Sequence, residues 1–118
     1  MYTITKDFAF SASHQLTGLP QTHQCARLHG HNYAVRIELS APALDANNFV
    51  RDYGELAELK RYIDDTLDHR HLNDVFGHGA VTAEFLAKAL YDWCAERWPE
   101  TSAVAVSETP KTWATWRP

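Results

Sequence analysis

The chain has 118 residues, of which 45% are hydrophobic and 22% charged, and its formal net charge is −4 at pH 7. This size and composition fit one globular domain, residues 1–118, and exclude a disordered chain. There is no basic stripe, so we expect no nucleic acid among the partners. No apolar run approaches the roughly 20 residues that a membrane helix needs, and the N-terminal residues hold no apolar signal core. We therefore expect no membrane association.

Only two cysteines are present, Cys25 and Cys94. Two are too few for a disulfide framework, and a cytoplasmic location is the default for such a chain. Cys94 falls inside a helical pattern, so we expect it to pack as a small apolar residue. Cys25 lies in a segment rich in histidine, where a thiol has other uses.

The N-terminal half predicts two strands. Residues 3–11 alternate between apolar and polar side chains, and residues 33–39 do so even more regularly. Between these strands, residues 17–24 contain glycine and proline breakers and are expected to form a loop. Residues 42–48 are rich in turn formers and lead out of the second strand.

Two helices are predicted next. The first follows residues 49–54, where one helical face carries mostly apolar residues. That face comprises Leu56, Leu59, Lys60, Ile63 and Leu67, with Lys60 as its one polar member. The His-rich residues 68–79 are expected to be irregular. Thr82 is a candidate N-cap for the second helix, with Glu84 in its first turn, and Pro99 ends it.

The chain is expected to finish with two strands, residues 103–108 and 111–117, separated by a turn at Pro110. The predicted order is therefore β-β-α-α-β-β. No parallel crossover is indicated, so we expect an α+β fold with a four-stranded antiparallel sheet and both helices on one face.

Three histidines stand at metal-binding spacing. On an extended segment His29 and His31 point to the same side, with Cα atoms about 6.5 to 7 Å apart. His14 ends the first strand and could supply a third nitrogen if the two strands pair. Three neutral imidazoles with an open fourth position are typical of catalytic zinc sites. The alternative is that these are ordinary polar residues on strands.

Cys25 precedes His29 by four positions, and a thiol near a cation becomes a useful base or nucleophile because its pKa falls. Asp68 and His69 follow one another in the loop after the first helix. A carboxylate can fix the tautomer of such an imidazole and stabilise its cation, which suits a proton carrier. The alternative for this pair is a solvated loop.

Glu108 follows two valines on the same face of its strand, where the pattern calls for an apolar residue. A buried carboxylate needs a partner, such as a ligand with adjacent N–H groups. The alternative is a strand-end glutamate in water. We expect the other three histidines, His23, His71 and His78, to lie on the surface.

Several motifs occur together in one order along the whole chain. They are Phe10-Ser11-Ala12-Ser13-His14, Cys25-x-x-x-His29-Gly30-His31-Asn32-Tyr33, Asp52-Tyr53 before Leu59-Lys60, Leu67-Asp68-His69 before Leu72-Asn73-Asp74, Thr82-x-Glu84 and Ser107-Glu108-Thr109. In this combination the chain resembles the 6-pyruvoyl-tetrahydropterin synthase family. The three-residue gap between Cys25 and His29 is similar to the branch of that family that makes 6-carboxy-5,6,7,8-tetrahydropterin. Two residues depart from the family pattern: Val81 replaces a common proline, and His71 adds a second imidazole after the relay pair.

The resemblance implies a role for each matched residue. His14, His29 and His31 would bind Zn²⁺, and Cys25 would accept a proton. Asp68 and His69 would form a proton relay. Glu108 would anchor the pterin ring, and Thr82 and Glu84 are candidate substrate-binding residues.

The fold implied is the tunnelling fold, in which subunits join their sheets into a barrel as a homo-oligomer, commonly a trimer or a hexamer built from two trimers. The activity implied is the zinc-dependent conversion of 7,8-dihydroneopterin triphosphate to 6-carboxy-5,6,7,8-tetrahydropterin, with release of acetaldehyde and triphosphate, in queuosine or other 7-deazapurine synthesis. The alternatives are the 6-pyruvoyl synthase reaction and a non-catalytic subunit with a closed site of Cys25 and the three histidines.

Overall fold

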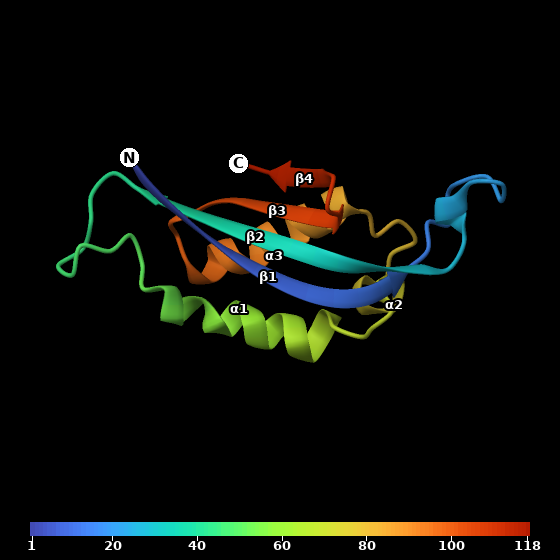
Figure 1. The fold of residues 1–118 in the computed structure, drawn as a ribbon, viewed down its shortest axis with the longest axis horizontal. Coiled ribbons are helices and arrows are strands. Elements are labelled where there is room, and N and C mark those ends of the chain that lie inside the picture. The colour runs from blue at the N-terminus through green and yellow to red at the C-terminus, as the bar shows by residue number, and fades with distance from the viewer.

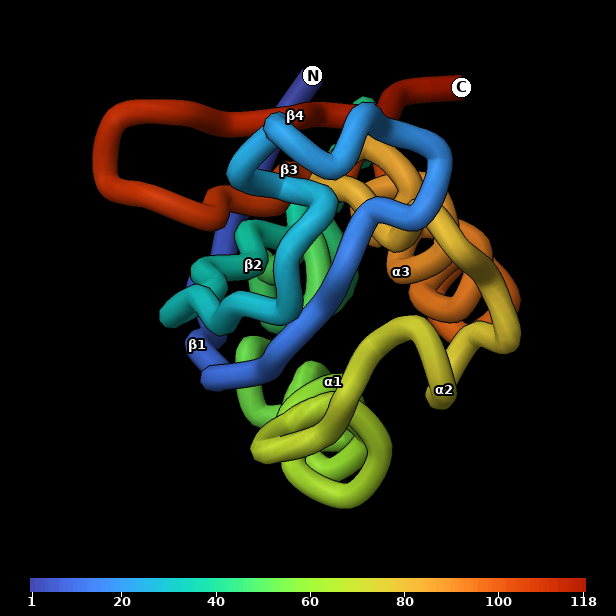
Figure 2. Tube along the Cα trace, turned by 90° about the vertical axis from the view of Figure 1, so that its right-hand side faces the viewer, coloured from blue at the N-terminus to red at the C-terminus, as the bar shows by residue number.

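One four-stranded antiparallel sheet forms the centre of the computed structural model, which describes residues 1–118. Its strands lie in chain order: β1 (Tyr2–His14), β2 (His29–Ala41), β3 (Thr101–Thr109) and β4 (Thr112–Trp116). The two main helical segments cover one face of this sheet, as the end-on view in Figure 2 shows. The α+β prediction, with an antiparallel sheet and helices on one face, is therefore confirmed. No helix has both the length and the apolar character to cross a membrane.

Strands β1 and β2 pair along their whole length, from Tyr2 opposite Ala41 to His14 opposite His29. Both strands are longer than the alternating pattern indicated, and they run past the helices toward one end of the molecule (Figure 1). Because side chains alternate along a strand, this register places Phe10 and Tyr33 on the helix-covered face. Their rings stack with centroids 4.9 Å apart. The same face continues outward to His14.

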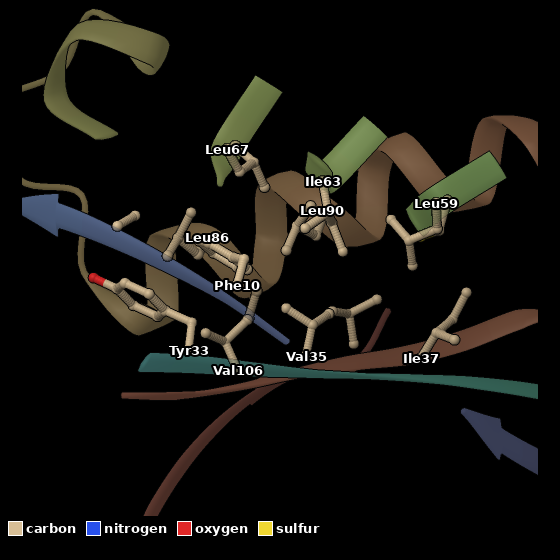
Figure 3. Close-up of a cluster of buried hydrophobic side chains, with 14 of the residues drawn as sticks. Phe10, Tyr33, Val35, Ile37, Leu59, Ile63, Leu67, Leu86, Leu90 and Val106 are labelled. Atoms are coloured by element: carbon tan, nitrogen blue, oxygen red, sulfur yellow. The ribbon is translucent and has the colours of Figure 1, made fainter. Parts of the chain in front are cut away.

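The hydrophobic core lies between this face and the helices (Figure 3). Fully buried side chains from the sheet meet fully buried side chains from the helical segments; among them are Val35, Ile37, Val104, Val106, Leu56, Leu59, Ile63, Leu67, Leu86 and Leu90. Cys94 is also buried, and burial raises the pKa of its thiol to about 12. It packs as a small apolar residue, as predicted.

The first predicted helix is a composite. A short 3₁₀ segment (Tyr53–Leu56) leads into α1 (Ala57–Tyr62), which continues as a π-helical turn (Ile63–Leu67). The leucine and isoleucine positions of the predicted face are buried, but Lys60 points to solvent and pairs with Asp64 at 2.6 Å. Lys60 lies at the edge of the apolar face, so its ammonium group can stay in water while the neighbouring Leu59 is buried.

Residues 68–79 differ from the prediction of an irregular segment. They contain a short helix, α2 (Leu72–Phe76), which ends at Gly77 in the left-handed conformation. Leu72 is fully buried and holds this helix against the core. The sequence pattern did not predict this helix, because Leu72 is its one fully buried apolar residue and the residues around it are mostly polar. The longer helix α3 (Ala83–Arg97) follows, and the Thr82 hydroxyl accepts a hydrogen bond from Phe85 N–H at its start, as the N-cap prediction required.

Shortening one core side chain tests the packing of α3. We expect Leu90→Ala to lower the free energy of unfolding by about 2–5 kcal/mol, because it removes buried apolar area and leaves a cavity. The matched control on the same helix is Glu96→Ala, whose exposed side chain lies away from the core, and it should change stability by less than about 0.5 kcal/mol. Denaturant unfolding at one fixed protein concentration measures both. Equal effects of the two substitutions would contradict this packing.

Candidate metal centre and active site

Three imidazoles converge at the end of the sheet. His14 on β1 and His29 and His31 on β2 each present one ring nitrogen, and these three atoms lie within 4.8 Å of one another. The ring centroids are 4.4 to 5.0 Å apart. This cluster arises because the β1–β2 register sets His14 directly opposite His29. Gly30 permits the close pairing here, since a Cβ at this position would lie 3.3 Å from the Ala12 carbonyl oxygen.

Backbone carbonyls orient two of the rings. His14 Nδ1 lies 2.7 Å from the Val81 carbonyl oxygen, and His29 Nδ1 lies 2.7 Å from the Arg27 carbonyl oxygen. A carbonyl can only accept a hydrogen bond, so each Nδ1 carries the hydrogen and each Nε2 keeps a free lone pair. This is the arrangement by which proteins prepare histidine for a metal ion.

The burial of these nitrogens supports the same conclusion. His14 Nε2 and His31 Nε2 are buried and have no hydrogen-bond partner within the chain. Desolvation lowers the pKa of His31, and the neighbouring histidines add to this, although the Glu108 charge opposes it. A neutral, partnerless imidazole is costly to bury unless something binds its lone pair. The three residues therefore fit a metal ion.

Glu108 adjoins the histidine cluster. Its carboxylate oxygens lie 4.0 Å from His14 Nε2 and 3.7 Å from His31 Nε2. Glu108 shares the helix-covered face of β3 with the buried Val104 and Val106. Its side chain is about one quarter exposed, which leaves it within reach of a ligand. Burial and the nearby Glu108 charge raise the pKa of Tyr33, whose hydroxyl is also buried without a partner.

Cys25 lies close to the cluster in sequence but outside it. It occupies a 3₁₀ turn (Gln24–Ala26), and its N–H donates to His23 Nδ1 at 3.0 Å. Its carbonyl accepts from Leu16 N–H at 2.9 Å, which ties the turn to the end of β1. The thiol is half-buried and is not among the atoms that could jointly hold a metal.

Asp68 and His69 form a pair along the outer edge of β1. His69 Nδ1 lies 3.0 Å from one oxygen of Asp68, whose other oxygen accepts from Ser11 N–H at 2.9 Å. That N–H is the main cause of the lowered pKa of Asp68. His69 has φ of 59°, which is unusual for a residue with a side chain, and its own N–H donates to Ser11 at 2.6 Å. A strained residue held by two strand contacts is typical of a functional position.

The His69 ring is 82% exposed, so its Nε2 faces outward from the chain. Thr82 uses its hydroxyl as the helix cap described above. Glu84 is exposed and lines a cavity of about 310 Å³ together with Glu108. The structure thus brings His14, His29, His31 and Glu108 together and holds Cys25 and the Asp68–His69 pair in separate segments. The roles predicted for these residues remain predictions.

Residues 3–118 match the family described as 6-pyruvoyl tetrahydropterin synthase. The chain belongs to this family. Family membership, predicted from the motifs, is thereby confirmed, and so is the expectation of an enzyme.

Relatives within the family span most of the chain. The 6-carboxy-5,6,7,8-tetrahydropterin synthase of Bacillus subtilis is 30% identical over 99% of this chain and 86% of its own length. The Synechocystis protein of the same name is 33% identical over 77% of this chain and 73% of its own length. The Caenorhabditis elegans 6-pyruvoyl tetrahydropterin synthase has a similar structure, with a TM-score of 0.86 at 25% identity, covering 99% of this chain and 95% of that one.

Sequence reasoning misplaced one residue next to the proposed relay pair, His71. His71 was expected on the surface, but it is half-buried and its Nδ1 lies 2.9 Å from Ser13 Oγ. It forms an isolated parallel bridge with Ser13 beside the site. The departure from the family pattern at this position was the available signal.

Proposed function

We propose that the protein is a zinc-dependent lyase that converts 7,8-dihydroneopterin triphosphate to 6-carboxy-5,6,7,8-tetrahydropterin, releasing acetaldehyde and triphosphate, in queuosine or other 7-deazapurine synthesis. The observation that carries this proposal is the convergence of three imidazoles, two with buried free Nε2 atoms, beside Glu108. The names of the Bacillus and Synechocystis relatives support the carboxylate product. We place the enzyme in the cytoplasm and regard residues 1–118 as one catalytic domain.

His14, His29 and His31 would hold the zinc ion. A three-histidine set with an open position suits Zn²⁺, which as a Lewis acid makes the C–H bonds beside the substrate's coordinated side-chain oxygens more acidic. The carbonyls of Val81 and Arg27 keep two of the rings in the tautomer that binds it. The Nε2 atoms of His14 and His31 are shielded from water.

Glu108 orients the pterin. Its two oxygens can accept from the adjacent N–H groups of the ring, and a pterin bound there would have its side chain near the metal site, since Glu108 lies next to His31. This converts binding energy into orientation of the reacting carbons. Cys25, as thiolate, removes a proton from the side chain. Its turn is tied both to β1 and, through the Arg27 carbonyl, to His29.

His69 delivers or accepts the second proton at Nε2, because its Nδ1 is engaged by Asp68. The exposed ring can reach a substrate held on a neighbouring subunit. We therefore also propose a homo-oligomer, a hexamer of two trimers, in which sheets join into a barrel. Such joining would give the outer edges of β1 and β4 a partner.

One observation favours a second candidate, the 6-pyruvoyl synthase reaction: the structural similarity to the C. elegans enzyme. The non-catalytic zinc subunit gains no such support, because Cys25 is not within the metal-binding group.

Product analysis tests the proposal. Zinc-loaded protein is incubated with 7,8-dihydroneopterin triphosphate, and the products are identified by mass spectrometry. We expect 6-carboxy-5,6,7,8-tetrahydropterin with one acetaldehyde per turnover. A 6-pyruvoyl product would establish the second candidate instead, and unchanged substrate would refute both.

A further inference from the structure

The side chain of Asn73 makes three hydrogen bonds, and all three go to backbone groups outside its own helix. Asn73 lies in the first turn of α2, and its Oδ1 accepts from Gln15 N–H at 2.9 Å. Its Nδ2 donates to the Gln15 carbonyl oxygen at 2.7 Å and to the His78 carbonyl oxygen at 3.1 Å. Both hydrogens of the amide group and one oxygen lone pair are therefore engaged.

The two backbone segments that Asn73 binds are the two that hold His14. Gln15 directly follows His14, at the point where the pairing of β1 with β2 ends. His78 begins the segment 78–81, whose last residue, Val81, presents its carbonyl oxygen to His14 Nδ1 at 2.7 Å. One amide side chain thus fixes both the backbone beside this metal-binding residue and the segment that orients its ring.

The segment 78–81 belongs to no helix or strand, so individual hydrogen bonds hold it in place. Ala80 N–H donates to His78 Nδ1 at 2.9 Å, and Thr17 N–H donates to the Gly79 carbonyl oxygen at 2.9 Å. Because the segment is short and internally bonded, a displacement of His78 also displaces the carbonyl at its other end.

Gln15 extends the same set of contacts to the turn that carries Cys25. The connection between β1 and β2 projects beyond the end of the sheet (Figure 1), so this turn has little of the core to pack against. Gln15 Nε2 donates to the Ala26 carbonyl oxygen at 2.8 Å, and Leu16 N–H donates to the Cys25 carbonyl oxygen at 2.9 Å. The position of Cys25 relative to the three histidines therefore depends on the two residues that follow β1.

We propose that Asn73 is a positioning residue for both halves of the site. Through the segment 78–81 it orients the ring of His14, and through Gln15 it holds the turn of Cys25 beside the histidine cluster. The part that concerns Cys25 rests on the proposed function, in which this thiol removes a proton. The alternative is that Asn73 only stabilises the start of α2.

Cobalt(II) is the probe for the first half, because its visible absorption depends on the ligands and their geometry. We expect Asn73→Ala to bind cobalt(II) about tenfold more weakly than the wild type, the lower end of the loss seen when a partner behind a metal ligand is removed. The control is Cys94→Ala, which removes a fully buried side chain of α3 outside the site and should leave the affinity unchanged.

A second variant tests the same half without altering α2. His78→Ala removes an exposed imidazole and its hydrogen bond to Ala80 N–H, which loosens the segment 78–81. We expect cobalt(II) binding to weaken about two- to tenfold, the range for one lost hydrogen bond. Far-UV circular dichroism checks that each variant is folded.

Gln15→Ala separates the two halves. It keeps the backbone groups that Asn73 binds and removes only the bond to Ala26, so cobalt(II) affinity should not change. Amide hydrogen exchange of residues 23–27 should accelerate about two- to tenfold, while that of residues 33–41 in β2 stays the same. In the proposed reaction kcat should fall with KM nearly unchanged, because the thiol moves and the pterin-binding groups do not.

Each half has results that would overturn it. The first half is wrong if wild type and Asn73→Ala bind cobalt(II) equally, if Cys94→Ala loses as much affinity as Asn73→Ala, or if His78→Ala binds as the wild type does. The second half is wrong if hydrogen exchange of the Cys25 turn is the same in Gln15→Ala and the wild type.

This proposal and the proposed function can fail separately, because neither cobalt(II) binding nor hydrogen exchange requires turnover. If no product forms but both measurements respond as expected, the positioning role of Asn73 stands and the proposed function falls. If product forms and both measurements match the wild type, the function stands and the positioning role falls.

Discussion

Replacing His29 with alanine is expected to remove the metal ion and, with it, turnover. The ring supplies one of three converging nitrogens, and its Nδ1 is already oriented by the Arg27 carbonyl. Loss of an orienting partner alone typically weakens metal affinity 10- to 100-fold, so loss of a ligand should weaken it by more than about 100-fold. His29 is only half-buried, so this variant should fold more readily than one at the buried His14.

Metal content, the shift of Tm on adding zinc and activity are the three measurements. A ligand at 100 times its Kd stabilises the folded state by about 2.7 kcal/mol, so zinc should raise the Tm of the wild type but not that of His29→Ala. The control is His23→Asn, which removes an imidazole outside the cluster while its amide oxygen can still accept from Cys25 N–H. If His29→Ala kept one zinc per chain, the three-histidine site would be wrong.

Replacing Cys25 with alanine is expected to abolish most turnover but leave the metal bound. Loss of a positioned proton acceptor costs about 10²- to 10⁴-fold in rate. The Cys25 thiol does not belong to the metal-binding group of His14, His29 and His31, so the zinc content of the variant should equal that of the wild type. Cys25→Ser should also be slow, because a hydroxyl ionises far less readily than a thiol at neutral pH.

The matched control is Cys94→Ala. Cys94 is fully buried in α3 with a raised thiol pKa, so its removal should reduce stability and leave the rate of the folded protein unchanged. Single-turnover rates and bound zinc are measured on each variant. Loss of zinc in Cys25→Ala would instead establish the closed structural site, and full activity would remove Cys25 from the mechanism.

Local sequence patterns identified β2 and the start of α3, two of the elements around the site. Alternation along residues 33–39 identifies β2, and the same alternation places His29 and His31 on the face of Val35 because the period of a strand is two. Thr82 marks the start of α3 because its hydroxyl caps a free N–H. Leu72, a single apolar residue in a polar stretch, gave no periodic signal, so α2 was missed.

The sequence by itself determined the strands, the main helices, the family and the residues that could hold a metal, since these depend on side-chain type and short-range spacing. Only the tertiary structure decided which of them meet. The β1–β2 register sets His14 opposite His29, and β3 brings Glu108 to the same histidines from more than 70 positions away. The contacts of residues 68–71 with the edge of β1 place His69, Arg70 and His71 around a cavity. Such juxtapositions depend on strand register and packing between distant segments, which no local pattern encodes.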